Sequence, residues 1–341
     1  MKPYRSLLPA AVAGVGMFIL IVDSKTALVG AEEGIDLCIR TVIPTLFPFF
    51  VLAIILTGSL TGAKSKLLRP FGRLCGIPKG AECILLTGLL GGYPVGAQCI
   101  SQAYATGLLS KVDASRMLGF CSNAGPAFLF GMSAFLFSNR SIPLLLWMIH
   151  IISAIVTGMV LPGKSNSEVS ASPNLIRSAG NTLQKSLRVT ANVCCWVLLF
   201  RIILTFLERW FLWALPQTGQ IVIAGVLELS NGYIALSSIK NECLRFILAS
   251  IFLSFGGICV LLQTASVTGQ AGLDLGLYFP GKLIQCAISA AISLCVSCHL
   301  YCDSNMPIPF LLVAIVMLGA GYIILAKIRK NSSSIPKPSV V

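Results

Sequence analysis

The stretch "ECILLTGLLGGYPVGAQCISQAYATG", residues 82–107, decides how the rest of the chain is interpreted. It is long and apolar enough to cross a bilayer, since a spanning helix needs about 20 apolar residues. Yet its centre reads Gly91-Gly92-Tyr93-Pro94-Val95-Gly96, and glycine and proline are the poorest helix formers. Unpaired backbone groups are so costly in hydrocarbon that a break at this depth persists only inside protein or beside a polar cavity. We therefore expect a re-entrant hairpin whose tip lies near the middle of the membrane.

The composition of the whole chain indicates a membrane protein. Of its 341 residues, 56% are hydrophobic and 11% are charged, whereas a soluble domain carries roughly 25% charged residues. The net charge of +13 does not indicate nucleic-acid binding, because the basic residues lie in loops beside apolar segments. We expect an all-α multi-pass protein of the cell membrane, in contact with the lipid bilayer.

Eight segments are apolar enough to span the bilayer without interruption. They are residues 7–22, 42–61, 117–137, 142–161, 189–208, 246–268, 282–300 and 307–326. The first could also be a signal peptide, but its cleavage signal is weak and we prefer an uncleaved span. Two further apolar segments, 83–106 and 220–239, are interrupted at the middle, the second by Glu228-Leu229-Ser230-Asn231-Gly232.

The distribution of basic residues favours hairpins for both interrupted segments. Residues 62–81, 162–188 and 327–341 are rich in Lys and Arg, as cytoplasmic segments are. If residues 83–106 crossed the bilayer fully, the segment 162–188 would face outward, against its charge. With two re-entrant hairpins, all three basic segments and both termini are expected to be cytoplasmic.

The two halves of the chain resemble each other. "LLTGLLGGYPVGAQCIS" (85–101) aligns with "VIAGVLELSNGYIALSS" (222–238), and "SRMLGFCSNAGPAFLFG" (115–131) aligns with "LRFILASIFLSFGGICV" (244–260). Each half has three full crossings, so the second copy is expected to be inverted. The predicted organisation is an N-terminal helix (1–29), repeat 1 (30–161), a linker with an interfacial helix (162–188), repeat 2 (189–300), a C-terminal helix (301–326) and a disordered tail (327–341).

Four breaks fall at corresponding positions of the two repeats: Gly91–Gly96, Ser122–Pro126, Glu228–Gly232 and Ser254–Gly257. Close packing or a kink would explain any one of them. Paired interruptions at corresponding positions, however, are typical of the substrate sites of transporters. Helix ends at such breaks offer free amides and carbonyls, with partial charges, to a ligand.

Polar side chains gather at the same breaks. The candidate substrate-binding residues are Gly92, Tyr93, Pro94, Gln98, Ser122, Asn123, Glu228, Ser230, Asn231 and Gly232. A carboxylate near the bilayer centre marks a functional site by default, so Glu228 could carry a proton or bind a cation or a substrate donor; the alternative is a structural ion pair with Arg201. Gln98 and Asn123 could bind substrate or serve packing alone, and Tyr93 could face an aromatic ring or the membrane interface.

Metal and cofactor sites are not expected. Cys295, Cys298 and His299 match a haem-attachment pattern, but they lie inside an apolar helix, where a packed stripe of cysteines is the better explanation. His150 and His299 are too far apart in sequence for a conventional zinc site. An enzyme is disfavoured because no nucleophile–base pair is recognisable, and the sequence has no P-loop pattern for ATP.

Several segments resemble the nucleoside-recognition (Gate) domain membrane proteins, in particular the sporulation integral membrane proteins of the YlbJ (SpoVV) type. They are "LFPFFVLAIILTGSL" (46–60), "LLGGYPVGAQ" (89–98), "FCSNAGPAFLFG" (120–131) and "GVLELSNGYIAL" (225–236). The family motifs fall on Gly92, Tyr93, Pro94, Gly96, Ala97, Ser122, Asn123, Pro126, Glu228, Ser230, Asn231 and Gly232. The resemblance implies a fold distantly like that of concentrative nucleoside transporters and, for the sporulation branch, a link to the passage of dipicolinic acid. The family often has Lys or Arg where this chain has Gln98.

The expected function is therefore transport of a small polar or anionic metabolite, dipicolinic acid above all, through a site between two hairpin tips. Dipicolinate is a rigid planar dianion, so Glu228 would repel it unless protonated or paired with a cation; proton or cation coupling would meet this need. The alternatives are transport of a nucleoside or other small solute, and a non-transporting scaffold or gate subunit. Expected partners are the small-molecule substrate, lipid, and a second copy of the chain or a sporulation membrane protein.

Overall fold

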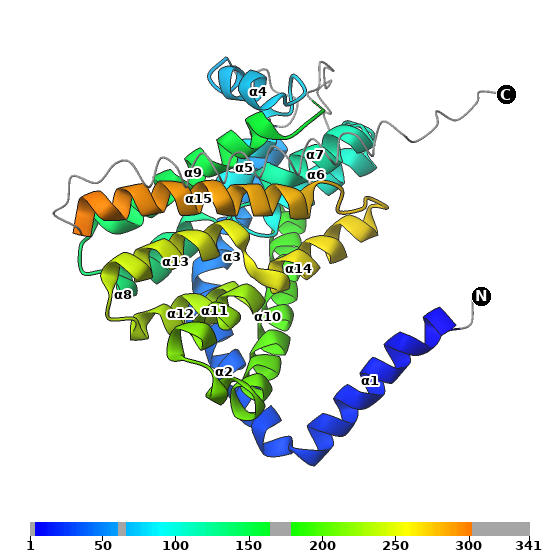
Figure 1. The fold of residues 1–341 in the computed structure, drawn as a ribbon. Helices are drawn as coiled ribbons and strands as arrows, with labels where there is room; N and C mark the ends of the chain where they lie inside the picture. The colour runs from blue at the N-terminus through cyan, green and yellow to red at the C-terminus, as the bar shows by residue number, and fades with distance from the viewer. Residues whose placement is uncertain (1–3, 61–65, 164–178, 302–341) are drawn as a thin grey trace.

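The structure is a computed structural model, and it describes residues 4–60, 66–163 and 179–301. In this part of the chain the secondary-structure elements are all helices, which confirms the all-α prediction for it (Figure 1). The predicted span 307–326, the tail 327–341 and most of the linker 162–188 lie outside the described residues.

The helices follow one order in the two predicted repeats. Repeat 1 contains α2 (Ser24–Leu37), a π-helical turn (Cys38–Val42), α3 (Ile43–Leu60), α4 (Arg69–Cys75), α5 (Glu82–Gly91), α6 (Val95–Ala105), α7 (Lys111–Cys121), α8 (Pro126–Leu136) and α9 (Ser141–Val160). Repeat 2 contains α10 (Ala179–Trp210), α11 (Gln217–Leu227), α12 (Leu229–Ala235), α13 (Glu242–Phe255), α14 (Gly257–Gln270) and α15 (Tyr278–Tyr301). In both, a long helix is followed by two pairs of short helices and a last long helix.

All four predicted breaks are present between helices. α5 ends at Gly91 and α6 begins at Val95, while α7 and α8 are separated by residues 122–125. In the second repeat, Glu228 separates α11 from α12 and Gly256 separates α13 from α14. Gly92 and Gly256 have φ values of +79° and +80°, in the left-handed region where glycine alone is unstrained, so they can end the preceding helices.

The first helix pair of each repeat folds back on itself through glycine. Gly88 of α5 and Gly96 of α6 both lie against the carbonyl group of Cys121, and a side chain at either position would overlap it. Two residues on opposite arms can reach one carbonyl only if the arms lie side by side. In the second repeat, Gly232 of α12 similarly contacts the backbone of Gly225 in α11. Both interrupted segments therefore form helical hairpins within the protein.

A long antiparallel helix pair joins the two repeats. Gly30 of α2 packs on α10, where a Cβ atom would lie 2.9 Å from the Cα of Ile202, and Gly34 lies one turn further along against Leu198. Small residues four apart allow this close approach in membrane helices. Ion pairs add to it, with Arg201 Nη2 2.5 Å from Glu33 Oε2 and Arg209 Nε 3.2 Å from Asp23 Oδ2. The first helices of the two predicted repeats thus run in opposite directions, while the inverted repeat itself stays a prediction.

Five helical segments in the described part are long and apolar enough to cross a membrane: 24–56, 141–160, 182–210, 242–270 and 278–301. The predicted span 42–61 is therefore only part of a longer helix, and 117–137 is divided into α7 and α8. The apolar helix at the N-terminus, Pro9–Val22, is shorter than the other spans. Residues 179–188, expected in an interfacial helix, are instead the first turns of α10.

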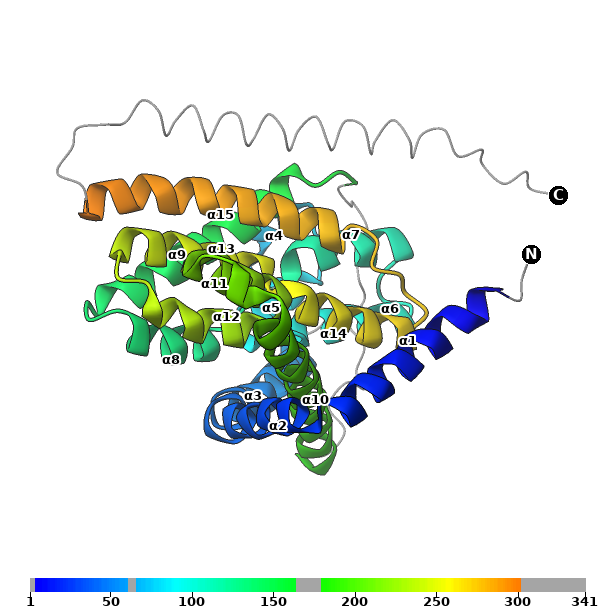
Figure 2. The same cartoon turned by 60° about the horizontal axis from the view of Figure 1, so that its bottom comes forward.

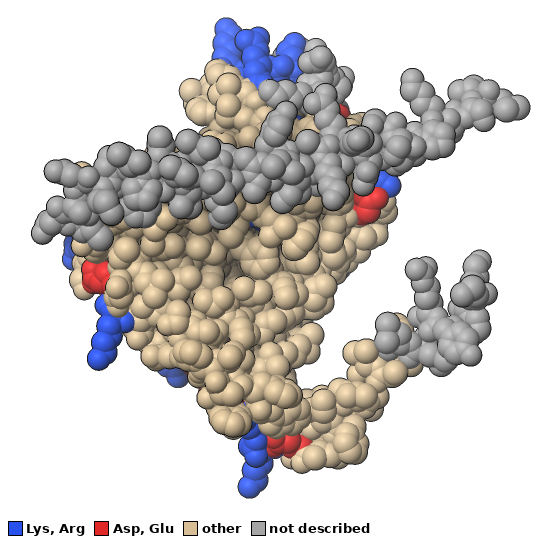
Figure 3. All heavy atoms as spheres, viewed as in Figure 1, with Lys and Arg blue, Asp and Glu red and all other residues tan. Residues whose placement is uncertain are grey.

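The helices do not form a parallel bundle. α10 and the α2–α3 helix cross the direction of α9, α13 and α15, which lie side by side (Figures 1 and 2). α1 (Tyr4–Val22) packs on α2 and extends away from the other described helices, with Val15, Phe18 and Ile21 exposed (Figure 1). Most of the surface in Figure 3 is uncharged, and basic side chains gather over α4. Such a surface is suited to lipid contact.

Candidate functional site

The four breaks meet in the interior of the protein. Gly125, between α7 and α8, lies against the tip of the first hairpin, where its Cβ atom would be 2.9 Å from the Cα of Gly92. In the other repeat, a Cβ atom at Gly257 would lie 3.3 Å from the backbone nitrogen of Leu229, at the tip of the second hairpin. Each hairpin tip therefore packs, backbone to backbone, on the break of the following helix pair.

A small cavity lies where these breaks meet, and we call it the central cavity. Its lining residues are Val42, Leu46, Gly92, Tyr93, Ala124, Gly125, Phe128, Val193, Val197, Glu228, Leu229, Ser230, Val260 and Gln263. The space that the centre of a water molecule can reach is about 40 Å³, and one water needs about 10–15 Å³. In this conformation the cavity has room for a few waters, and an organic substrate would require it to widen.

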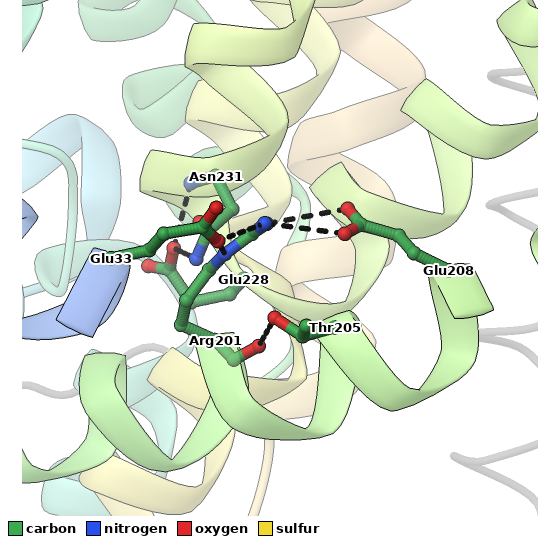
Figure 4. Close-up of polar contacts among 6 residues, drawn as sticks. All are labelled: Glu33, Arg201, Thr205, Glu208, Glu228 and Asn231. Atoms are coloured by element: carbon green, nitrogen blue, oxygen red, sulfur yellow. Dashed lines mark hydrogen bonds and ion pairs between the residues drawn. The ribbon is translucent and has the colours of Figure 1, made fainter. Parts of the chain in front are cut away.

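Glu228 supplies the carboxylate of the central cavity, and its side chain is 2% exposed. It also caps α12, since one carboxylate oxygen accepts hydrogen bonds from the backbone nitrogen and the side-chain amide of Asn231, at 2.7 and 2.8 Å. Arg201 instead forms ion pairs with Glu33 and with Glu208. Its Nη2 atom lies 3.2 Å from Glu208 Oε2 (Figure 4). Among the described residues, Glu228 and Arg201 therefore form no ion pair with each other, in contrast to the alternative prediction.

Beside the central cavity, a buried lysine joins the first hairpin to the breaks. Lys282 Nζ, on α15, donates to the Tyr93 hydroxyl at 3.2 Å, to Gln285 Oε1 at 2.7 Å and to the backbone carbonyl of Ser122. The Asn123 side chain completes the cluster, because its Oδ1 atom accepts from Gln285 Nε2 at 2.9 Å. No carboxylate pairs with Lys282 among the described residues. Its charge is held by carbonyl and hydroxyl dipoles and by the rings of Tyr93 and Tyr278, 5.1 and 5.9 Å away.

His150 of α9 lies between the two broken helix pairs. Its Nε2 atom accepts from the backbone nitrogen of Ala124 at 3.1 Å, which leaves the proton on Nδ1, 3.4 Å from Ser254 Oγ. Tyr93 makes a second connection, because its hydroxyl donates to the Leu253 carbonyl at 3.3 Å. Residues of both repeats are therefore linked by buried hydrogen bonds around the central cavity.

Two larger cavities lie on either side of the central cavity. One, the basic cavity, has a volume of about 450 Å³ and is lined by Ile54, Gln98, Cys99, Gln102, Lys185, Arg188, Val189, Asn192, Val267 and Gln270. The other, the acidic cavity, has about 620 Å³ and is lined by Glu32, Glu33, Asp36, Leu37, Arg40, Thr41, Arg201, Leu204, Glu208, Ala224, Asn231, Ile234 and Ala235. Along α10 the basic cavity takes residues 185–192, the central cavity 193–197 and the acidic cavity 201–208. Along the antiparallel α2–α3 helix the order is reversed, so the three cavities follow one another beside this helix pair.

The predicted site residues are divided among these features. Gly92, Tyr93, Glu228 and Ser230 line the central cavity. Ser122 and Asn123 lie in the Lys282 cluster, and Pro94 caps α6 next to the hairpin tip. Asn231 donates to the capping carboxylate of Glu228 and lines the acidic cavity, and Gly232 allows the close contact of α12 with α11. Gln98 is not at the central cavity, because it lies one turn into α6 and lines the basic cavity.

Lys282, Gln285, His150 and Gln263 were not predicted as site residues. A signal for the first two existed in the sequence. Lys282, Gln285, Ser289, Ser293 and Ser297 recur every three or four residues along α15 and are all buried, which is the spacing of one helix face. Tyr93 is also buried, at 7% exposure, so it does not face the membrane interface. The described residues contain no group of three or more His, Cys, Asp or Glu side chains suited to a metal ion.

Comparison with known proteins supports the resemblance that the motifs indicate. The chain is similar to the sporulation integral membrane protein YlbJ of Bacillus subtilis (strain 168), with 22% identity over 311 residues that cover 78% of this chain and 76% of that protein. No family model matches the chain, and no solved structure matches it. The resemblance to the YlbJ type is thus confirmed, while the nucleoside-recognition (Gate) domain stays a prediction.

Proposed function

From this similarity to a sporulation integral membrane protein, and from the geometry of the breaks, we propose that the chain is a secondary transporter of a small polar or anionic metabolite. The observation that carries the proposal is that three of the four helix breaks line one cavity, which contains a buried carboxylate, while the fourth break packs against Tyr93 and Leu229 beside it. Broken backbone at membrane depth is tolerated where it lines a cavity, and paired breaks of this kind form substrate sites in transporters.

The row of three cavities gives the transported solute a route. The basic and acidic cavities are each large enough for a small molecule, and the central cavity between them is nearly closed. A transporter must not be open to both sides at once, and a narrow centre between two wide ends meets that need. The basic residues over α4 and in the basic cavity favour the cytoplasm for that end, with the N- and C-termini on the same side.

Dipicolinate is the favoured substrate, and the Glu228 carboxylate then needs a role. The amides of Ser230 and Asn231 and the Ser230 hydroxyl surround the Glu228 carboxylate, and they could donate to a carboxylate of the substrate in its place. A negative charge on Glu228 would repel a dianion in the same cavity, so the anion enters after Glu228 is protonated or together with a cation. We therefore propose that anion movement is coupled to a proton or cation at Glu228.

Uptake into liposomes that contain the purified full-length chain tests this function. Dipicolinate uptake should exceed that of empty liposomes and should change with an imposed pH gradient. Glu228→Gln should abolish the pH dependence, because the amide keeps an acceptor for Asn231 but binds no proton. Lys240→Gln, at an exposed residue outside all three cavities, is the matched control and should transport as the unaltered chain does.

The same experiment separates the competing functions. Uptake of a nucleoside in place of dipicolinate would identify a neutral-solute transporter. Absence of any flux from folded protein, together with stable association with another sporulation membrane protein, would identify a scaffold or gate subunit.

A further inference from the structure

The basic cavity differs from the other two cavities in the chemistry of its lining. Four helices form it, and they contribute Ile54 from α3, Gln98, Cys99 and Gln102 from α6, Lys185, Arg188, Val189 and Asn192 from α10, and Val267 and Gln270 from α14. None of these lining residues is acidic. The cavity therefore has two positive charges and four side-chain amides, and no negative charge to neutralise them.

Lys185, Arg188 and Asn192 lie on one face of α10, since they are three and four residues apart. Neither Lys185 nor Arg188 forms an ion pair with any of the described residues, and both are exposed to the cavity or to solvent. Like charges at this spacing repel each other along a helix. An anion between them would replace that repulsion with attraction, so the arrangement favours a bound negative group.

The amides of the cavity surround the two charges from other helices. Gln98 and Gln102 are four residues apart on α6, and Gln270 ends α14. An Arg guanidinium binds a carboxylate through two parallel hydrogen bonds, while a Lys ammonium acts as a point charge, and amide N–H groups can complete the remaining bonds. Arg188 and Lys185 together could thus hold two separate carboxylates of one small molecule. The volume of about 450 Å³ lies within the usual range of small-molecule sites.

The basic cavity is also adjacent to the central cavity along two elements. Val189 lines the first and Val193 the second, one helical turn further along α10. On α6, the backbone nitrogen of Gln98 donates to the carbonyl of Pro94 at 3.0 Å, so Gln98 is one turn from the hairpin tip. A turn of helix is about 5.4 Å long. An anion in the basic cavity is therefore one short step from the tips of the breaks.

We propose that the basic cavity is a loading site for small dicarboxylates, in which Arg188 and Lys185 bind the two carboxylates before the anion moves to the central cavity. This inference rests on the proposed function, but it concerns a separate site and a stated class of substrate. It also gives Gln98 a role at the loading site, where its amide donates to the bound anion. The acidic cavity at the other end has an excess of carboxylates, so the two ends of the route differ in their affinity for an anion.

Equilibrium binding of radiolabelled dipicolinate to the full-length chain in nanodiscs of neutral lipid tests the loading site. Neutral lipid is used so that no anionic headgroup competes for the cavity. The K185Q/R188Q double variant should bind dipicolinate at least tenfold more weakly, and the binding that remains should lose most of its dependence on salt. Picolinate, which has one carboxylate, should bind to the unaltered chain more weakly than dipicolinate does. The double variant should reduce the affinity for picolinate by a smaller factor than the affinity for dipicolinate.

Two further variants complete the test. R140Q/K240Q removes two exposed positive charges that line none of the three cavities, and it should bind dipicolinate as tightly as the unaltered chain. Q270K adds a third positive charge to the cavity and should tighten binding, which keeps the inference testable if the double variant does not fold. Equal dipicolinate affinity in K185Q/R188Q, Q270K and the unaltered chain would overturn the inference, as would the absence of dipicolinate binding to folded, unaltered protein.

Failure of the loading site and failure of the transport function give different results. If liposomes take up dipicolinate with the same half-saturating concentration with and without Lys185 and Arg188, transport stands and the loading site is wrong. If dipicolinate binds in a manner that depends on Lys185 and Arg188 but no flux occurs, the site stands and the transport function is wrong.

Discussion

Lys282 Nζ lies 3.2 Å from the hydroxyl oxygen of Tyr93, although 189 residues separate the two in sequence. The contact joins the last helix of repeat 2 to the tip of the first hairpin of repeat 1. The Tyr93 hydroxyl in turn donates to the carbonyl of Leu253, just before the break between α13 and α14. Lys282 and Tyr93 thus connect three parts of the chain: the start of α15, the tip of the first hairpin and the end of α13.

Replacement of Lys282 by Met should lower stability. The Ser122 carbonyl and Gln285 Oε1 would lose their donor while remaining buried, at a cost of about 1–3 kcal/mol for each group. Thermal unfolding of the purified protein in detergent measures the change, with Lys240→Met as the exposed control. A raised melting temperature would instead mean that burying the charge costs more than its hydrogen bonds return, and would indicate that Lys282 serves function.

Glu228→Gln should remove the negative charge of this side chain without removing its hydrogen bonds to Asn231. The amide oxygen can still accept from Asn231, so the melting temperature should change little, while proton-coupled uptake falls at least tenfold. Glu228→Ala removes the cap of α12 as well and should cost about 1 kcal/mol of stability. Normal uptake by Glu228→Gln would contradict a central role for this carboxylate.

A methyl group at Gly88 should disrupt the first hairpin. It would overlap the Cys121 carbonyl, which belongs to backbone and cannot rotate away. We expect Gly88→Ala to lower the free energy of unfolding by about 1–3 kcal/mol or more. Gly14→Ala is the matched control, because no atom lies within 4 Å of a Cβ built at Gly14. Equal melting temperatures for the two variants would show that α5 and α7 are not in such close contact.

Cysteine labelling should find both ends of each hairpin on one side of the membrane. In a background without native cysteines, thiols at positions 73 and 106 flank the first hairpin, and thiols at 218 and 241 flank the second. A membrane-impermeant reagent added to intact cells should react with the second pair and not with the first. Labelling of one member of a pair without the other would contradict the re-entrant arrangement.

The breaks could be predicted from sequence because their causes are local. The cluster of Gly91, Gly92 and Pro94 disfavours a continuous helix through local backbone effects, and so do the glycines after Phe255. The packing of each hairpin tip on the following break was not predicted, because it depends on contacts between residues far apart in sequence. These local signals predicted helix breaks at the positions where Gly92, Tyr93, Glu228 and Ser230 line the central cavity.

The partners of the charged and polar groups could not be predicted in this way, because they depend on packing. Lys282 stands at the edge of the predicted span 282–300, where a lysine is usually taken to face the membrane surface. Its buried position depends on how α15 packs on α7, with Gly281 against Gly119. Gln98 follows the hairpin motif closely in sequence, yet α6 packs on α14 and α3, and Gln98 lines the basic cavity that these helices form with α10.

The apolar wall of the central cavity has a consequence for energy conservation. Val42, Leu46, Val193 and Val197 face the hairpin tips from α3, α10 and the π-turn, and none of them can hydrogen-bond to water. This side of the cavity offers no hydrogen bonds to a continuous file of water, along which protons would leak, and the cavity has room for only a few waters. If the chain acts as the proposed transporter, this closed conformation should conduct few protons, so that a resting cell keeps its membrane potential when no substrate is bound.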